Sequence, residues 1–201
     1  ANSCSATASV MVNVLPLPIL QLSPIAPTLC DGESIILTVS GANTYLWSPA
    51  LGLNTTIGNS VIATPNTNTT YSVTGTDINN CSDIISVNII VNPLPNVSVQ
   101  PAIASICEGS SVNVNAFGAN TYSWSPSVGL NTSVGNIVVA SPQSTMDYTI
   151  TGTDANNCQN TDQVNVTIHA LPSVNAGSDQ AECEGTPITL SGTGAISYSW
   201  D

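Results

Sequence analysis

The sequence predicts an all-β protein built from modules of about 77 residues that follow one another end to end. Val, Ile, Thr, Ser and Asn dominate the composition, whereas Lys and Arg are absent, which favours strands and turns over helices. Short runs alternate apolar with polar residues, the period of a half-buried strand. The same residue types also recur at a fixed spacing, which indicates a tandem repeat.

Cysteine and tryptophan define the repeat. The early cysteines are Cys30, Cys107 and Cys183, the late cysteines are Cys4, Cys81 and Cys158, and the tryptophans are Trp47, Trp124 and Trp200. Late cysteines recur at a constant offset, since 81 − 4 and 158 − 81 both equal 77, and each tryptophan follows an early cysteine at an offset of 47 − 30 = 17. We therefore expect the last strand of one repeat in 1–16, whole repeats in 17–95 and 96–172, and the first part of another in 173–201.

The first whole repeat carries the signals of six to seven short strands, and the second repeat matches them. Leu20 and Leu22 begin a strand that Pro24 and Pro27 interrupt, so we expect it at a sheet edge. The run CDGE at 30–33 predicts a turn. The apolar residues of the later strands are, in chain order, Ile35, Leu37 and Val39; Tyr45 and Trp47; Val61 and Ala63; Tyr71 and Val73; and Val87, Ile89 and Val91.

Short strands of this number, with one large aromatic residue per repeat, indicate an immunoglobulin-like β-sandwich. We expect Trp47, Trp124 and Trp200 to fill the cores. Tyr71 and Tyr148 open the penultimate strand, where such domains place a tyrosine corner. The residue two places later is valine or isoleucine, so these repeats lack the inter-sheet disulfide of antibody domains.

The charge balance excludes two classes of partner. The chain has 12 acidic residues and no Lys or Arg, so it cannot displace the counterions of a nucleic acid. Electrostatic docking on anionic lipid is excluded for the same reason. No apolar run reaches the roughly 18 residues of a membrane span, so we expect no direct membrane insertion.

Two strings carry a resemblance to a known family: CDGESIILTVSGANTYLWSPALGLNT from residue 30 and TTYSVTGTDINNCSDIISVNIIVNPLP from residue 69. They resemble the PKD-like or Ig-like tandem repeats of giant extracellular surface proteins of Bacteroidetes, of the gliding-motility-associated adhesin type that the type IX route secretes. The resemblance covers essentially the whole chain and implies an exported stalk, adhesin or filament-forming repeat. It implies no particular ligand, and the total lack of Lys and Arg departs from the family's usual acidity.

The six cysteines predict disulfides rather than zinc, because no CxxC occurs and the chain has one histidine. The simplest pairing lies within each repeat, Cys30–Cys81 and Cys107–Cys158. Each bond would close about 50 residues and contribute roughly 4 kcal/mol. Cys4 and Cys183 would then pair outside this stretch of chain. The alternative is pairing across repeats, such as Cys30–Cys158, which would tie successive domains covalently.

The turns before the late cysteines offer oxygen ligands for calcium. These are Asp77 and Asn79 in one repeat, and Asp154 and Asn156 in the next. The pattern lacks the glycine and distal glutamate of an EF-hand loop. We therefore favour hairpin-turn chemistry, in which Asp and Asn bond to nearby main chain, and predict no metal or cofactor.

No catalytic arrangement stands out, and we predict that the chain is not an enzyme. The single histidine, His169, corresponds to Asn92 of the first repeat, and a catalytic group would not be interchangeable in this way. We expect an extracellular, cell-surface stalk or filament whose repeats associate with one another or with other copies. The alternatives are a carbohydrate- or surface-binding module, or accessory domains of a secreted enzyme.

Overall fold

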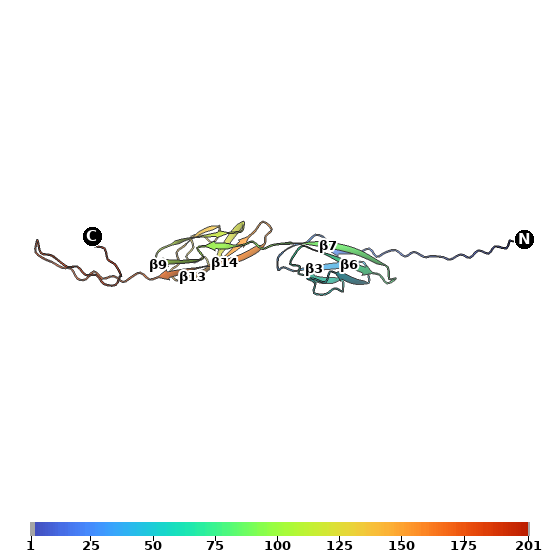
Figure 1. The fold of residues 1–201 in the computed structure, drawn as a ribbon, viewed down its shortest axis with the longest axis horizontal. Coiled ribbons are helices and arrows are strands. Elements are labelled where there is room, and N and C mark those ends of the chain that lie inside the picture. Colours follow the sequence, from blue (N-terminus) through green and yellow to red (C-terminus); the bar gives the residue numbers. More distant parts are fainter. Residues whose placement is uncertain (1–2, 201) are drawn as a thin grey trace. The chain divides into compact units, whose positions relative to one another are not determined.

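The computed structural model describes residues 3–200, and every regular element in that range is a β-strand (Figure 1). The chain divides into two compact units, Ala1–Leu94 and Pro95–Asp201. The strands of the first unit are β1 (Gln21–Ser23), β2 (Thr28–Cys30), β3 (Ile35–Ser40), β4 (Thr44–Ser48), β5 (Ser60–Ala63), β6 (Thr69–Thr76) and β7 (Ser82–Asn92). Those of the second are β8 (Ser98–Gln100), β9 (Ile103–Cys107), β10 (Val112–Phe117), β11 (Thr121–Ser125), β12 (Ile137–Ala140), β13 (Met146–Thr153) and β14 (Gln159–His169).

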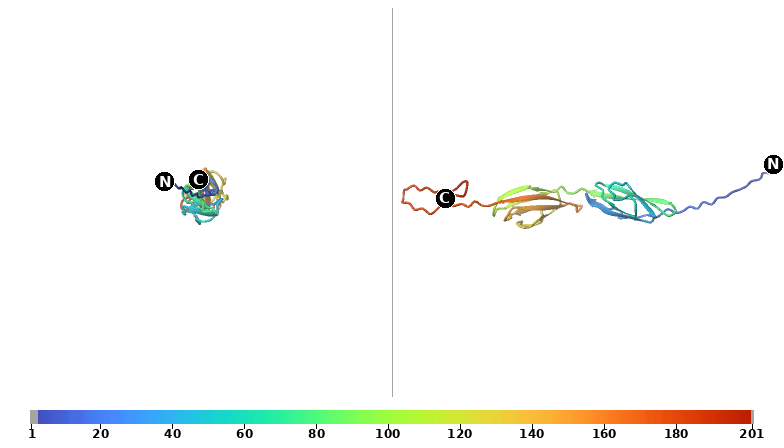
Figure 2. Two further views of the ribbon diagram at one scale, coloured as in Figure 1. Left: turned by 90° about the vertical axis from the view of Figure 1, so that its right-hand side faces the viewer. Right: turned by 90° about the horizontal axis from the view of Figure 1, so that it is seen from below.

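Each unit is a sandwich of a three-stranded and a four-stranded sheet. The first unit has the orders β1-β3-β5 and β2-β7-β6-β4, and the second has the equivalent orders β8-β10-β12 and β9-β14-β13-β11. The right-hand view of Figure 2 shows each group of strands from a further side. The predicted all-β fold of tandem immunoglobulin-like sandwiches is confirmed.

The first segment of each repeat contributes to both sheets. β1 pairs with β3 alone, so the predicted edge strand is confirmed. After Pro24 and Pro27 the chain crosses to the other sheet, where β2 pairs with β7 in parallel. β8 and β9 repeat this switch. The turn that we expected at 30–33 therefore begins on the last residue of a short strand that the sequence pattern did not indicate.

The inward-facing residues of the two sheets form one core per unit. Trp47 and Trp124 are 2% and 4% exposed, and each indole N–H donates to a main-chain carbonyl, of Gly58 at 2.9 Å and of Gly135 at 2.8 Å. The other buried core residues of the first unit are Leu22, Leu29, Leu37, Val39, Val61, Ala63, Tyr71, Val73, Val87 and Ile89. Those of the second are Val97, Val99, Ala104, Val114, Ala116, Tyr122, Val138, Ala140, Tyr148, Ile150, Val164 and Val166.

Tyr71 and Tyr148 are fully buried at the positions expected of a tyrosine corner, but their hydroxyls reach further along the chain. They donate to the carbonyls of Leu51 and Val128, each at 2.7 Å and each 20 residues upstream. A tyrosine corner bonds only a few residues upstream. The tyrosines here anchor the long loop that follows the tryptophan strand.

The segments 3–20 and 173–200 do not form the strands that we expected there. Residues 3–20 form no strand, and Val10, Val12 and Val14 are exposed. Residues 173–200 contain one isolated bridge, and Trp200 is 46% exposed rather than buried in a core. The reason is that a strand needs a partner for its main-chain groups and an opposing sheet for its apolar face. In the described residues, neither segment joins a sheet.

Candidate functional sites

A hairpin turn positions each late cysteine. In the first unit, Asp77 Oδ1 accepts hydrogen bonds from the main-chain N–H groups of Asn79 and Cys81, at 2.8 and 2.9 Å. Asp77 N–H donates to the Cys81 carbonyl at 2.9 Å, which closes the turn. Asn80 has a φ of 62°, a left-handed conformation that asparagine tolerates well.

The second unit repeats this turn atom for atom. Asp154 Oδ1 accepts from the N–H groups of Asn156 and Cys158 at 2.8 and 2.9 Å, and Asn157 has a φ of 64°. One carboxylate oxygen, Oδ1, is thus already a main-chain acceptor in both repeats. Among residues 3–200, no three His, Cys, Asp or Glu side chains gather as a metal-binding group.

A second turn positions each early cysteine. Cys30 ends β2, its N–H donates to Glu33 Oε2 at 2.8 Å, and Asp31 N–H donates to the Asn92 carbonyl at 2.9 Å. In the second unit Glu108 N–H donates to the His169 carbonyl at 2.8 Å. His169 is exposed and its carbonyl does the same work as that of Asn92. At this position the main-chain carbonyl accepts the equivalent hydrogen bond in both units, although the side chains differ.

The cysteines differ in redox state. Cys30 and Cys158 are disulfide-bonded. Cys4, Cys81, Cys107 and Cys183 carry free thiols. The favoured pairs within a repeat, Cys30–Cys81 and Cys107–Cys158, are therefore not formed, and that prediction was wrong.

The register of the last strand explains why a pair within one repeat does not form. Cys158 directly precedes β14, whereas Cys107 lies beside His169, the last residue of β14. Ten residue steps along a strand separate the two ends by roughly 33 Å. A disulfide needs its two Cα atoms within about 7 Å. In the first unit, Cys81 precedes β7 and Cys30 lies beside Asn92 at its other end, with the same result.

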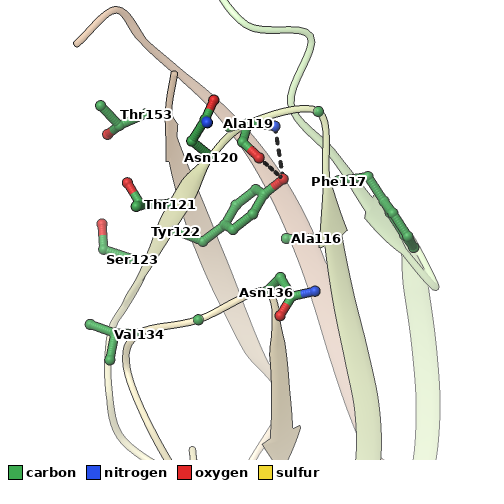
Figure 3. A pocket seen from close by; sticks show the side chains of 12 residues that line it. Ala116, Phe117, Ala119, Asn120, Thr121, Tyr122, Ser123, Val134, Asn136 and Thr153 are labelled. Carbon is green, nitrogen blue, oxygen red and sulfur yellow. Dashed lines mark hydrogen bonds between the residues drawn. The ribbon is translucent and has the colours of Figure 1, made fainter. Parts of the chain in front are cut away.

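Each unit also has a shallow groove below the turn that follows β3 or β10. The groove of the second unit has a volume of about 740 Å³ and that of the first about 590 Å³. Figure 3 shows the Tyr122 ring beneath the turn, where its hydroxyl donates to the Ala119 carbonyl and accepts from the Ala119 N–H. Asn120, Thr121, Ser123, Asn136 and Thr153 supply polar groups around the rim.

No protein-family model matches the sequence, and no curated protein matches it. Among solved structures, the chain is similar to the insect immune protein hemolin, at 11% identity and TM-score 0.40, over 76% of this chain and 47% of that chain. It is similar to Drosophila N-cadherin EC1-4 at 12% identity and TM-score 0.33, over 76% and 50%. It is also similar to the first eight Ig domains of Down syndrome cell adhesion molecule. The identity is 13% and the TM-score 0.32, over 79% of this chain and 25% of that chain. The chain thus spans half or less of these proteins, and likeness at this level says nothing of their functions in this chain.

Sequence reasoning missed the parallel strand that carries each early cysteine. The one sign of this strand in the sequence was the apolar Leu29, which follows Pro27 and precedes the turn at 30–33. Its side chain is 7% exposed and lies in the core. A three-residue strand is too short to show a period. The groove was also missed, because its lining comes from strand ends and loops that are apart in sequence.

Proposed function

We propose that the chain is a structural stretch of an extracellular, cell-surface stalk or filament, made of tandem immunoglobulin-like repeats. The observation that carries this proposal is the constant offset of 77 between the two units. It relates Trp47 to Trp124 and Tyr71 to Tyr148, together with their hydrogen-bond acceptors. Copying one unit together with these anchoring contacts adds length.

The extracellular location rests on the disulfide chemistry. Disulfides persist in oxidising compartments and are rare in the cytosol, and Cys30 and Cys158 are bonded. Within residues 3–200 no helix has the length and apolarity that a membrane crossing requires. The lack of Lys and Arg also removes every site for trypsin-like proteases, which favours persistence outside a cell.

The long last strand sets the length that one repeat adds. β7 and β14 have 11 residues each, so each spans roughly 35 Å, and with its turns a repeat measures roughly 35–45 Å. A protein lengthened by four copies of 96–172 should therefore gain about 140–180 Å in electron micrographs of the surface structure, with surface attachment unchanged. A matched insertion that carries Trp124→Ala in every copy should not fold and should give no regular increment. Loss of attachment with unchanged length would reject a spacer role.

A second function, sugar binding, is supported by the groove. It occurs at the same place in both units, and its rim carries hydroxyl and amide groups that suit a polyhydroxylated ligand. The groove of the second unit also includes Phe117, which is 49% exposed and stands where the first unit has Ser40. Binding of the chain to a glycan array, lost in Asn136→Ala and kept in Asn113→Ala on β10, would establish this function. If the chain binds no glycan on the array, the sugar-binding function is rejected and the spacer function is the one that remains.

A further inference from the structure

The sequence contains six Asn-x-Ser/Thr triplets, the pattern that accepts N-linked sugars in exported proteins. Their asparagines are Asn54, Asn68, Asn80, Asn96, Asn131 and Asn165. Only one of these positions carries the triplet in both repeats, since Asn54 and Asn131 are 131 − 54 = 77 residues apart. The third residue is threonine in one repeat and serine in the other, so the hydroxyl that the pattern requires is present in both.

These two asparagines lie on the loops that run beside edge strands. β5 and β12 each pair with one strand of their sheet. Asn54 Oδ1 accepts the Ile62 N–H at 2.7 Å, and Asn54 N–H donates to the Ile62 carbonyl at 3.0 Å. Asn131 makes the same two bonds with Val139, at 2.7 and 3.0 Å. The asparagine is therefore fixed along the outer edge of the strand by its main chain and by one side-chain oxygen.

The side-chain nitrogen, which is the atom that an N-linked sugar uses, has no part in this anchoring. Asn54 and Asn131 are exposed, and within residues 3–200 neither Nδ2 makes a hydrogen bond. A sugar on Nδ2 leaves the Oδ1 lone pairs in place, so the bond to the strand N–H is kept. The folded repeat therefore tolerates a modified asparagine at this position.

The hydroxyl of the third residue of the triplet is also unused by the fold. In the described range, neither Thr56 Oγ1 nor Ser133 Oγ makes a hydrogen bond. Their main-chain carbonyls accept the main-chain N–H groups of Trp47 and Trp124, at 2.7 and 2.8 Å. Any residue has a carbonyl for that purpose. A hydroxyl residue in both repeats thus indicates recognition by a molecule outside the fold.

Asn165 has the opposite arrangement. It is half-buried on β14, and its Nδ2 donates to Asp147 Oδ1 at 2.7 Å. The third residue of its triplet, Thr167, donates its hydroxyl to Asn165 Oδ1 at 2.8 Å. In the first repeat the equivalent position, Asn88, is followed by two isoleucines and is no triplet of this kind. Both polar groups of this triplet serve the fold, so Asn165 is an internal comparison.

We propose that Asn54 and Asn131 are acceptors of N-linked sugar chains, one in each repeat. The inference rests on the proposed extracellular location, because this pattern is modified in secreted proteins. The co-reactant is a sugar chain joined through its anomeric carbon to a lipid diphosphate. Nδ2 forms a bond to that carbon, and the bond from the carbon to the diphosphate oxygen breaks with its electron pair. The Nδ2 proton passes to a base of the transferase and then to solvent.

A sugar chain at these positions would stand along the edges of β5 and β12. An exposed sheet edge is a template for pairing with another chain. Asn54 already occupies both main-chain groups of Ile62. A bulky hydrophilic chain at the same point would keep a second sheet from approaching. The modification would therefore hold neighbouring copies apart at this edge.

Mass spectrometry of the denatured protein, purified from the surface fraction of the cells that make it, tests this inference. Cleavage before aspartate places the two acceptors and the comparison asparagine on the separate peptides 31–76, 83–146 and 162–178. We expect the first two to be heavier than their sequences by a sugar chain, which fragmentation places on Asn54 and Asn131. The third should have its sequence mass. Denaturation releases any sugar that is only held in the groove, so the added mass reports a covalent bond.

Substitutions of the third residue give matched variants that keep the bonds of the asparagine. Thr56→Ala should remove the added mass from peptide 31–76 alone, and Ser133→Ala should remove it from 83–146 alone. Thr56→Ser and Ser133→Thr should keep it. All four variants should fold, because neither hydroxyl has a partner in the described structure. Added mass that persists in the alanine variants, or that fragmentation places on a threonine or serine, would overturn the inference.

The cell fraction that holds the protein separates this inference from the proposed function. Protein at the cell surface with unmodified Asn54 and Asn131 would reject the sugar acceptors and leave the extracellular stalk in place. Protein found only inside the cell would reject the extracellular location, and the acceptors with it. Modified Asn54 and Asn131 in the surface fraction would support both.

Discussion

At the scale of single residues, the buried tyrosine hydroxyls hold the long loops to the core. In Tyr148→Phe the Val128 carbonyl loses its 2.7 Å donor. We expect a loss of about 1 kcal/mol in the free energy of unfolding, because a partly buried hydrogen bond is removed. Urea denaturation measures it. Ser123→Ala, at an exposed position of the same unit, serves as the control and should stay within about 0.5 kcal/mol. Equal losses would show that the hydroxyl contributes nothing specific.

The same tyrosines predict how stability depends on pH. Burial raises the pKa of Tyr71 and Tyr148 above the ordinary value of 10.0. A phenol whose pKa is higher in the folded state contributes its full stability below the unfolded pKa and loses it as pH rises through the folded pKa. With free thiols alkylated, the urea midpoint should hold up to about pH 9 and fall above about pH 10. In the double variant Tyr71→Phe/Tyr148→Phe the urea midpoint should fall less steeply with pH. If its curve runs parallel to that of the unchanged protein, ionisation of these tyrosines is not the cause of the fall.

Two glycines with positive φ in the second unit differ in what surrounds them. Gly118 has a φ of +92°, and a Cβ added there would overlap the carbonyl oxygen of Asn96. Gly109 has a φ of +80° with nothing within 4 Å of such a Cβ. Gly109→Ala should cost about 1–2 kcal/mol from backbone strain alone. Gly118→Ala should lower the free energy of unfolding by clearly more in the same urea titration, because the main chain at Asn96 must also move to make room for the Cβ. Similar costs would mean that the Asn96 contact is not tight.

At the scale of elements, we expect the hairpin turn before each late cysteine to be stable without a cation. Asp154 already accepts two main-chain N–H groups, so chelation by EDTA should leave the melting temperature unchanged within about 1 °C. Asp154→Ala should lower the free energy of unfolding by about 1 kcal/mol, as the loss of similar side-chain caps does. The exposed Asp179→Ala is the control. If EDTA lowers the melting temperature and added calcium reverses the fall, the turn binds calcium and this prediction is wrong.

The elements also show how far sequence reasoning reached. Alternation found the strands of Leu37, Val61 and Val87, since a face that packs on the core must be apolar at every second residue. It did not find β2 and β9, because three to five residues between prolines and a turn carry no readable period. That omission decided the disulfide prediction. Without the parallel pairing to β7, the sequence did not show which end of the sheet Cys30 lies at. Pairing each early cysteine with the next cysteine along the chain was then the simplest choice.

The candidate sites divide in the same way. The role of Asp77 and Asp154 as turn acceptors follows from local sequence, because both donors lie within four residues. The anchoring of Tyr71 to a carbonyl 20 residues away depends on how the loop folds back, and no local pattern contains it. Trp200 is exposed because its segment joins no sheet in the described residues, although Tyr198 to Trp200 repeats the sequence of Tyr122 to Trp124.

At the scale of the whole molecule, the cysteines lie outside the core clusters. These clusters contain Trp47 and Trp124 but no cysteine. In a Trp200→Phe background, reduction by dithiothreitol should therefore leave the tryptophan emission maximum unchanged, because the buried indoles keep their surroundings. Urea should produce the red shift that reduction does not. A red shift on reduction alone would mean that the disulfide holds the sandwiches themselves together.

The constant offset of the two units also has a consequence for the gene. A crossover between equivalent codons of two copies removes or adds one whole module and leaves each remaining junction with an equivalent proline-containing link and equivalent cysteine turns. We expect natural variants of this protein to differ in length by whole multiples of about 77 codons. Selection on the reach of the structure would then act through module number, with no new contacts to evolve.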